Sequence, residues 1–199
     1  MAGSTNRLRE VALASRSPRR KQILESVGLR VVVVPSSYHE PAYRPADGDP
    51  RKFARTVARN KANAAAAEGP PVLVAADTIV VAGASVYGKP RDAEHAREML
   101  RELSGRDHTV YTGFAAVDRA AGAGEDGVES ARVTFLNLDE DRIAAYVESG
   151  EPLDKAGSYG IQGLGALLIA SIAGDFFTVM GLPLARIDQA LARLGYRLL

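Results

Sequence analysis

The segment from Val11 to Gly28 reads as a short apolar strand, a polar turn and a helix, and the rest of the fold has to accommodate this unit. Val11–Ala14 is the apolar run, and Ser17 belongs to the residue types that begin helices well. Pro18 is tolerated as a first helical residue, since that position has no intrahelical use for an N–H group. Gly28 suits the left-handed backbone that ends many helices. The segment therefore predicts a strand–turn–helix unit near the start of the chain.

Two arginines, Arg19 and Arg20, fall in the first turn of this helix. The helix dipole disfavours cations at that end, so the pair is costly unless an anion lies nearby. Free N–H groups at a helix N-terminus bind phosphate, and arginine adds a forked set of donors. The alternative is a solvated basic turn. The strand–turn–helix context favours the phosphate site.

Length and composition restrict the class of protein. With 199 residues the chain suits one domain or two small lobes that share a core. A formal net charge of +1 gives no reason to expect a general role on nucleic acid or a membrane surface. The absence of cysteine excludes disulfides and thiolate metal sites. No apolar run has the length of a membrane span, and the first ten residues lack the apolar core of a signal peptide, so we expect a cytoplasmic protein.

The rest of the chain alternates between predicted strands and helices. Strands are expected at residues 29–34, 72–76, 79–82, 108–117 and 128–136, and helices at residues 50–68, 92–104, 139–148 and 184–194. Asp126 and Gly127 form a hairpin-type pair between two of these strands. Residues 166–172 and 176–180 read as a second hairpin around Gly174 and Asp175. His108 reads as a strand residue with no evident partner.

Two carboxylates are candidates for chemistry. Asp77 interrupts an apolar strand, and a carboxylate there is costly to desolvate unless it binds a metal, a cation or several N–H donors. A turn-capping aspartate is the alternative, but the strand resumes at Ile79 instead of giving way to a loop. Thr78 fits either use. Glu40 lies in a proline-rich loop just beyond a strand end, a usual place for site residues, although most loop carboxylates are simply solvated.

A glycine loop, LDKAGSYGIQGLG at residues 153–165, is the second unusual stretch. Glycines at this density supply positive φ and let the backbone approach a ligand closely. Gln162 offers both a donor and an acceptor, which suits the edge of a base. The stretch is neither a P-loop nor a dinucleotide fingerprint. A flexible hairpin is the alternative, and the interleaved apolar residues fit it poorly.

Four motifs together resemble the Maf family of nucleoside triphosphate pyrophosphatases: SRSPRR at residues 15–20, ADTIV at 76–80, KPRDAEHA at 89–96 and LDKAGSYGIQG at 153–163. The resemblance implies one α/β domain over residues 1–199, with a long, bent mixed β-sheet flanked by helices and two lobes around a central cleft. This fold is similar to that of the inosine triphosphate pyrophosphatases. Members are usually cytoplasmic homodimers that need a divalent metal, Mg²⁺ or Mn²⁺.

The resemblance also assigns roles to single residues. The catalytic set it implies is Glu40, Lys61, Asp77 and Lys89, with Asp77 as the base and with Glu40 and Asp77 as metal ligands. The implied substrate-binding residues are Ser15, Arg19, Arg20, Thr78 and Gln162. Of these, Arg19 and Gln162 look like the branch that acts on dTTP and UTP. The branch that prefers 7-methyl-GTP usually has Trp and Glu at these two positions.

Two positions depart from the family pattern. His39 stands where many members have an acidic residue, and Asn60 replaces a common Glu before the helix lysine Lys61. Read from the residues alone, Lys61 and Lys89 could equally be exposed cations. A protein that binds a nucleotide for regulation, linked to septum formation, is the rival class. A pyrophosphatase that prefers another base, such as 7-methyl-GTP or ITP, is the second rival.

Overall fold

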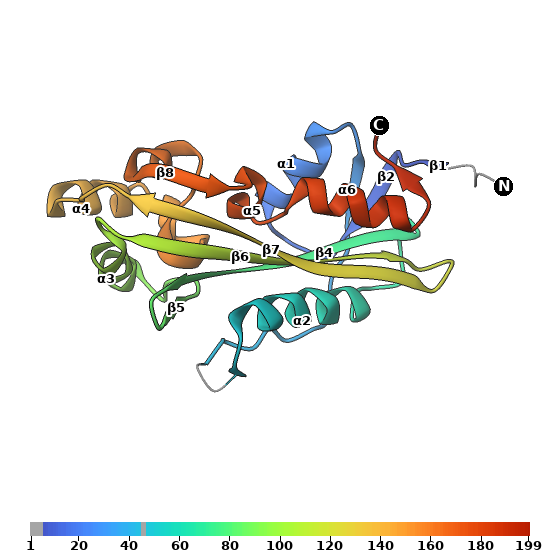
Figure 1. Cartoon of the computed structure of the whole chain (residues 1–199), viewed down its shortest axis with the longest axis horizontal. Helices are drawn as coiled ribbons and strands as arrows, with labels where there is room; N and C mark the ends of the chain where they lie inside the picture. Colours follow the sequence, from blue (N-terminus) through green and yellow to red (C-terminus); the bar gives the residue numbers. More distant parts are fainter. Residues whose placement is uncertain (1–5, 45–46) are drawn as a thin grey trace.

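A seven-stranded mixed sheet forms the centre of the molecule in the computed structural model, which describes residues 6–44 and 47–199 (Figure 1). The path of hydrogen-bonded neighbours is β3-β2-β4-β6-β7-β8, and β5 pairs with β4. β2 is parallel to β3 and β4, and the remaining pairs are antiparallel. The strand bounds are β2 Glu10–Leu13, β3 Arg30–Val33, β4 Val72–Ala82, β5 Ser85–Tyr87, β6 Asp107–Asp118, β7 Ala123–Phe135 and β8 Ile169–Gly174. β1 (Asn6–Arg7) and β9 (Tyr196–Arg197) form a small parallel sheet that joins the two ends of the chain.

Helices cover both faces of the sheet, as the resemblance implied. Figure 1 shows α1, α5 and α6 on one face and α2 on the other, with α3 and α4 toward the end of the sheet near β8. The helix bounds are α1 Pro18–Ser26, α2 Pro50–Asn63, α3 Ala93–Leu103, α4 Glu140–Glu148, α5 Phe176–Met180 and α6 Leu184–Arg193. Three 3₁₀ turns, η2 Glu151–Asp154, η3 Ala156–Ser158 and η4 Gly163–Leu168, make up much of the glycine loop and its flanks. The expected α/β fold with a mixed sheet is confirmed.

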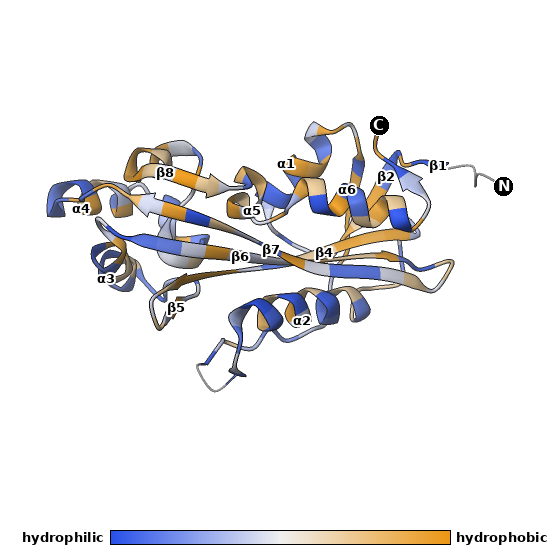
Figure 2. Cartoon of the chain, in the orientation of Figure 1, coloured by the Kyte–Doolittle hydropathy of each residue, from blue (hydrophilic) through white to orange (hydrophobic). Residues whose placement is uncertain are grey.

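Two main hydrophobic cores follow one another along the long strands β4 and β6. The first packs α1 and α6 against one end of the sheet, and the second packs α3 and α4 at the other end. A smaller cluster lies under α2. On β4, Ala76 belongs to the first core and Val80 to the second. Asp77 and Thr78 therefore lie where the two cores meet, and Figure 2 shows the polar break in an otherwise apolar strand.

The turn between β6 and β7 differs from the expectation. It lies at residues 119–122, where Gly122 has a φ of +65°. Asp126 and Gly127, expected to form the turn, lie inside β7 and pair with Ala115 and Phe114. A Cβ on Gly127 would lie 2.7 Å from the Phe114 ring, so the glycine is needed for packing across the strands. The Asp–Gly pair was the wrong turn signal because this contact joins residues that are distant in sequence.

The second predicted hairpin is also wrong, because residues 176–180 form the helix α5. Asp175 begins this helix, and its Oδ2 accepts hydrogen bonds from the Thr178 N–H and hydroxyl, both at 2.7 Å. A five-residue apolar run does not by itself distinguish strand from helix. The predicted helix at 50–68 is shorter than expected and ends at Asn63. Within the described residues, no helix is both long enough and apolar enough to cross a bilayer. The expectation for the extreme N-terminus falls in part on residues 1–5, outside the described residues.

Candidate active site

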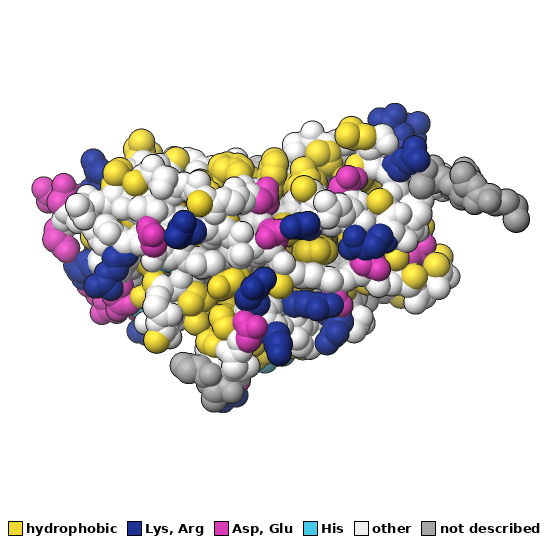
Figure 3. Space-filling view, viewed as in Figure 1, with side chains coloured by type: hydrophobic (Ala, Val, Ile, Leu, Met, Phe, Trp, Pro, Cys, Tyr) yellow, Lys and Arg dark blue, Asp and Glu magenta, His cyan; other side chains and the backbone are white. Residues whose placement is uncertain are grey.

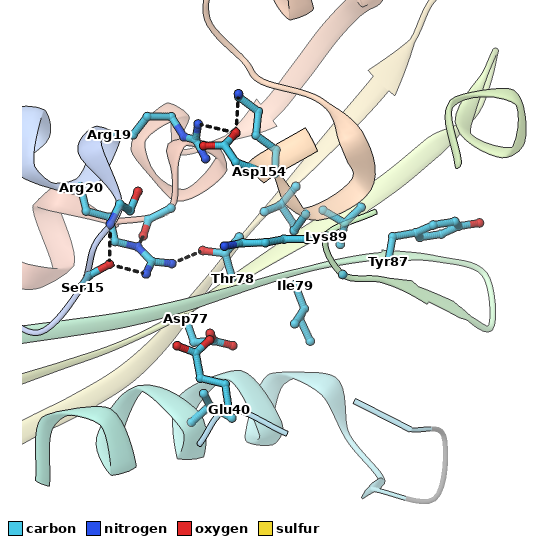
Figure 4. A pocket seen from close by; sticks show the side chains of 18 of the residues that line it. Ser15, Arg19, Arg20, Glu40, Asp77, Thr78, Ile79, Tyr87, Lys89 and Asp154 are labelled. Atoms are coloured by element: carbon cyan, nitrogen blue, oxygen red, sulfur yellow. Dashed lines mark hydrogen bonds and ion pairs between the residues drawn. The ribbon is translucent and has the colours of Figure 1, made fainter. Parts of the chain in front are cut away.

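A cavity of about 1500 Å³ opens between the two cores. The turn before α1, the loop after β3, α2, the middle of β4, the segment after β5, α3 and η2–η3 all contribute to its wall. Figure 3 shows hydrophobic side chains gathered between α2 and α3, beside the charged rows over α2. The structure brings eight of the predicted site residues together on this wall: Ser15, Arg19, Arg20, Glu40, Lys61, Asp77, Thr78 and Lys89. Figure 4 shows most of them converging from opposite sides.

Arg20 is buried and serves as a clamp. Its Nε donates to the Gly181 carbonyl at 2.7 Å, one Nη donates to Ser15 Oγ at 3.1 Å and the other donates to Thr78 Oγ1 at 3.1 Å (Figure 4). Burial lowers the pKa of Arg20, while Asp77 and Glu40 oppose that shift. These three bonds tie the start of α1 to β4 and to the end of α5.

Arg19 has a different environment. Its side chain is 26% exposed and forms an ion pair with Asp154 Oδ1 at 3.7 Å. Lys155 Nζ donates to the same carboxylate at 2.8 Å. This ion pair connects the first turn of α1 to the start of the glycine loop, and both segments line the cavity (Figure 4). A phosphate that binds Arg19 has to compete with Asp154.

Lys61 reaches the cavity from α2 and lies between the two candidate carboxylates. Its Nζ is 2.7 Å from Glu40 Oε1 and 3.7 Å from Asp77 Oδ1, and the residue is 6% exposed. Burial raises the pKa of Asp77 although Lys61 and Arg20 pull it down. Burial also opposes ionisation of Glu40, but its hydrogen bond to Lys61 and the charge of Lys61 outweigh burial and hold its pKa below the usual value. Neighbouring carboxyls whose pKa values are pushed apart are typical of acid–base sites.

The chemistry of this pair fits a divalent cation shared with a substrate. Mg²⁺ prefers oxygen ligands and commonly binds through one or two carboxylates, water and phosphate oxygens. Among the described residues, no group of three or more His, Cys, Asp or Glu side chains is arranged to hold a metal. Glu40 and Asp77 would therefore be the protein ligands, and substrate would complete the coordination.

The two departures from the family pattern lie at the edge of the site. His39 is exposed in the loop after β3 and lies outside the cavity wall. Asn60 donates from Nδ2 to the Tyr38 hydroxyl at 3.3 Å, so it braces that loop instead of pairing with Lys61. Neither residue alters the contacts of Lys61 with its two carboxylates.

Gln162 is placed differently from the other predicted residues. It is exposed and does not line the cavity, although its neighbours Gly160 and Ile161 do. Its assignment as a base-reading residue stays a prediction. Sequence reasoning also missed the partner of His108, whose Nε2 lies 2.7 Å from the hydroxyl of Tyr159 in the glycine loop. The aromatic residue in that loop was the available signal, but the contact spans 51 positions.

A model of the Maf-like protein family matches residues 10–194. The chain belongs to this family. Relatives named dTTP/UTP pyrophosphatase include that of Moorella thermoacetica, 49% identical over 94% of this chain and 95% of its own length. Those of Symbiobacterium thermophilum and Carboxydothermus hydrogenoformans are 46% and 43% identical, over 95% and 94% of this chain and 96% and 100% of their own lengths. A solved structure described as a nucleoside-triphosphatase / dITP/XTP pyrophosphatase from Mycobacterium abscessus aligns with 93% of this chain and 94% of its own, with a TM-score of 0.43 and 18% identity.

In this Maf-like protein Thr78 belongs to the same internal network as Arg20. Its Oγ1 accepts from Arg20 and lies 3.0 Å from Thr112 Oγ1, which in turn donates to the Thr178 carbonyl at 2.8 Å. Thr78 therefore holds the clamp in place at the cavity wall. Arg16, Arg19 and Lys89 also line this wall, and their positive charges are not part of the clamp.

Proposed function

We propose that this Maf-like protein is a pyrophosphatase that hydrolyses dTTP and UTP to the nucleoside monophosphate and pyrophosphate. The observation that carries the proposal is the meeting of Glu40, Lys61 and Asp77 in a cleft next to the buried Arg20. The names of the relatives, which match over nearly their whole length, support the pyrimidine substrates.

The triphosphate is expected to lie between α1 and the Lys89 segment. The free N–H groups at the start of α1 and the guanidinium of Arg19 suit phosphate oxygens, and Lys89 adds positive charge from the other side. Arg20 holds this frame in position through its three internal bonds. Charge neutralisation by preorganised groups is the main way in which such a site lowers the barrier to attack on a polyphosphate.

Asp77 is the expected general base. Water attacks the α-phosphorus, the bond from this phosphorus to the α–β bridging oxygen breaks, and pyrophosphate leaves. The proton of the attacking water goes to the Asp77 carboxylate, whose raised pKa makes it a stronger base than an ordinary aspartate. A divalent cation held by Glu40 and Asp77 would supply Lewis-acid polarisation of the phosphate oxygens. Lys61 keeps both carboxylates oriented toward one point.

The two alternative functions, a regulatory nucleotide-binding protein and a pyrophosphatase for another base, predict different products. A regulatory protein would bind nucleotide in this cleft without turnover, but such a protein has no use for a base with a raised pKa beside a phosphate site. A pyrophosphatase for 7-methyl-GTP or ITP would keep the chemistry and change the base pocket.

Product release from a panel of nucleotides tests the proposal. The panel is dTTP, UTP, CTP, ITP, GTP and 7-methyl-GTP, each with Mg²⁺, with Mn²⁺ and with EDTA. We expect pyrophosphate chiefly from dTTP and UTP, and none in EDTA. In water enriched in ¹⁸O, the label is expected in the monophosphate, because attack is at the α-phosphorus. Turnover chiefly of a nucleotide with another base would overturn the substrate assignment. Binding without turnover would overturn the proposal that the protein is an enzyme.

A homodimer and a cytoplasmic location stay predictions from the resemblance. Mass photometry of the purified chain tests the first, with an expected mass of twice the 21.1 kDa of one chain.

A further inference from the structure

Glu151, at the start of η2, lies inside the curve of the glycine loop. Its Oε2 accepts the Leu164 N–H at 3.0 Å, and its Oε1 accepts the Gly165 N–H at 3.1 Å. Oε1 also accepts the hydroxyl of Tyr146, from α4, at 3.0 Å. One carboxylate thus receives three donors, two of them from the backbone at the far end of the loop.

Tyr146 extends this contact to the near end of the loop. Its hydroxyl oxygen accepts the Gly160 N–H at 3.0 Å while its proton goes to Glu151. Burial raises the pKa of Tyr146, so the hydroxyl keeps the proton that it donates. Gly160 on one side and Leu164 and Gly165 on the other are therefore fixed to the same pair of side chains. Gln162 lies between these two fixed points.

The glycines of the loop are explained by this internal anchor. A Cβ on Gly163, whose φ is +65°, would lie 2.7 Å from Glu151 Oε2. A Cβ on Gly165 would lie 2.2 Å from the Gly160 carbonyl oxygen and 2.7 Å from the Tyr146 hydroxyl. The sequence indicated that the glycines allow close approach to a ligand, whereas at these positions the close approach is to Glu151, Tyr146 and the loop itself.

The same segment contacts the phosphate side of the cleft. Lys155 Nζ donates to the backbone carbonyl of Glu151 and to Asp154, which pairs with Arg19. Asp154, Lys155, Gly160 and Ile161 line the cavity. The anchored loop is therefore the part of the cavity wall that continues from Arg19 and Asp154.

We propose that Glu151 is a positioning residue for substrate selection: its carboxylate, with Tyr146, holds Gly160 and Ile161 on the cavity wall and the adjoining Gln162 at its edge, where we place the nucleoside. The proposal rests on the proposed function in assigning a nucleotide to the cleft. Glu151 itself touches neither the phosphates nor the reacting atoms in this arrangement.

The first test is amide hydrogen exchange in the free protein, which does not depend on activity. In Glu151→Gln the amide nitrogen of the new side chain cannot accept a backbone N–H, so one or both of the Leu164 and Gly165 amides lose their acceptor. We expect these amides to exchange at least tenfold faster, with the helices unchanged. Glu148→Gln, an exposed carboxylate on α4, is the matched control and is expected to match the wild type. Unchanged exchange in Glu151→Gln would overturn the anchor, whether or not the wild type hydrolyses dTTP.

The second test is selectivity. We expect Glu151→Gln to raise KM for dTTP about tenfold with less than a threefold loss of kcat, and to reduce the preference for dTTP over CTP. Tyr146→Phe removes the hydroxyl that donates to Glu151 while keeping the ring, so it is expected to act in the same direction with a smaller effect. It replaces Glu151→Gln in the test if that variant folds poorly. In a Gln162→Ala background Glu151→Gln should change the preference less than twofold, because coupled residues are not additive. Additive losses, or a loss confined to kcat, would overturn the positioning role.

Discussion

Burying the Asp77 carboxylate in a strand lowers the stability of the fold, and the proposed role of Asp77 as general base explains why an aspartate stands there. It occupies the middle of a buried strand, and burial raises its pKa despite two neighbouring cations. We predict that Asp77→Asn lowers kcat by on the order of 10²–10⁴-fold, as the loss of a general base does. Nucleotide binding, followed by calorimetry, should persist. Asp141→Asn, an exposed carboxylate on α4, should keep full activity.

The sign of the pKa shift predicts a pH profile and a stability change. A carboxyl with a raised pKa acts as a base only above that raised value, so the acid limb of kcat is expected above the 3.8 of an ordinary aspartate. The folded state favours the protonated form, so the charge destabilises it at neutral pH. Asp77→Asn is therefore expected to raise Tm while it lowers kcat. A variant that loses both activity and stability would indicate a mainly structural aspartate.

The burial of His108 predicts that the free energy of unfolding depends on pH in the acid range. Burial lowers the pKa of His108 to about 4, while the charge of Asp107 opposes that shift. Within the described residues its Nδ1 has no hydrogen-bond partner. The unfolded chain therefore binds more protons between pH 6.5 and pH 4, and the free energy of unfolding falls as the pH falls through that window. The shift corresponds to a loss of about 3 kcal/mol.

Urea unfolding between pH 7 and pH 4 checks this prediction. His108→Gln cannot titrate, so its acid dependence should be flatter than that of the wild type by roughly the same 3 kcal/mol. His39→Gln, in an exposed loop, is the matched control and should follow the wild type. Parallel plots of the free energy of unfolding against pH for His108→Gln and the wild type would contradict the prediction that His108 is buried in its neutral form.

Single residues were predicted well from the sequence where their chemistry conflicts with their local environment. Asp77 in an apolar strand and Arg19 at a helix start are such cases, and both line the cleft. Glu151 was missed because its backbone partners lie 13 and 14 positions away, and His108 because its partner lies 51 positions away; nothing local marks such contacts. The two arginines also look equivalent in the sequence, although Arg20 is saturated by internal bonds and Arg19 is not.

Among the elements, the packing of α2 on β6 sets the position of Lys61. A Cβ on Gly113 of β6 would lie 2.2 Å from the Ala54 carbonyl oxygen, which belongs to the backbone of α2. We predict that Gly113→Ala costs about 1–3 kcal/mol, typical of overpacking, since the helix has to move. That movement shifts Lys61 relative to Asp77 on β4, so kcat should fall as well.

Thermal unfolding and steady-state kinetics on the same preparations check this prediction. The control is Gly124→Ala on β7, where the nearest atom to the new Cβ is a Val117 methyl at an ordinary 3.5 Å. It should leave activity unchanged. Full activity in a destabilised Gly113→Ala variant would show that the packing of α2 on β6 does not set the position of Lys61.

Element boundaries were predicted best where hydrophobic periodicity is long. The helices α3, α4 and α6 and the strands β4 and β6 lie close to their expected ranges. Two of the errors involve short signals: Gly127 packs against the Phe114 ring inside the sheet, and Asp175 caps the apolar run of α5 as a helix. The cleft itself could not be derived from periodicity, because it depends on which strands become neighbours.

At the scale of the whole molecule, two long strands make the two lobes one unit. β4 and β6 contribute to both main cores, so neither core can lose these strands without exposing the other. We predict a single cooperative transition in calorimetry, with equal calorimetric and van't Hoff enthalpies, in agreement with a single domain. A nucleotide at about 100 times its Kd should add about 2.7 kcal/mol to the free energy of unfolding, because it binds a cleft that both lobes build. Two resolved transitions, with the nucleotide moving one of them, would instead mean that the lobes fold separately and that the cleft is an interface between two domains.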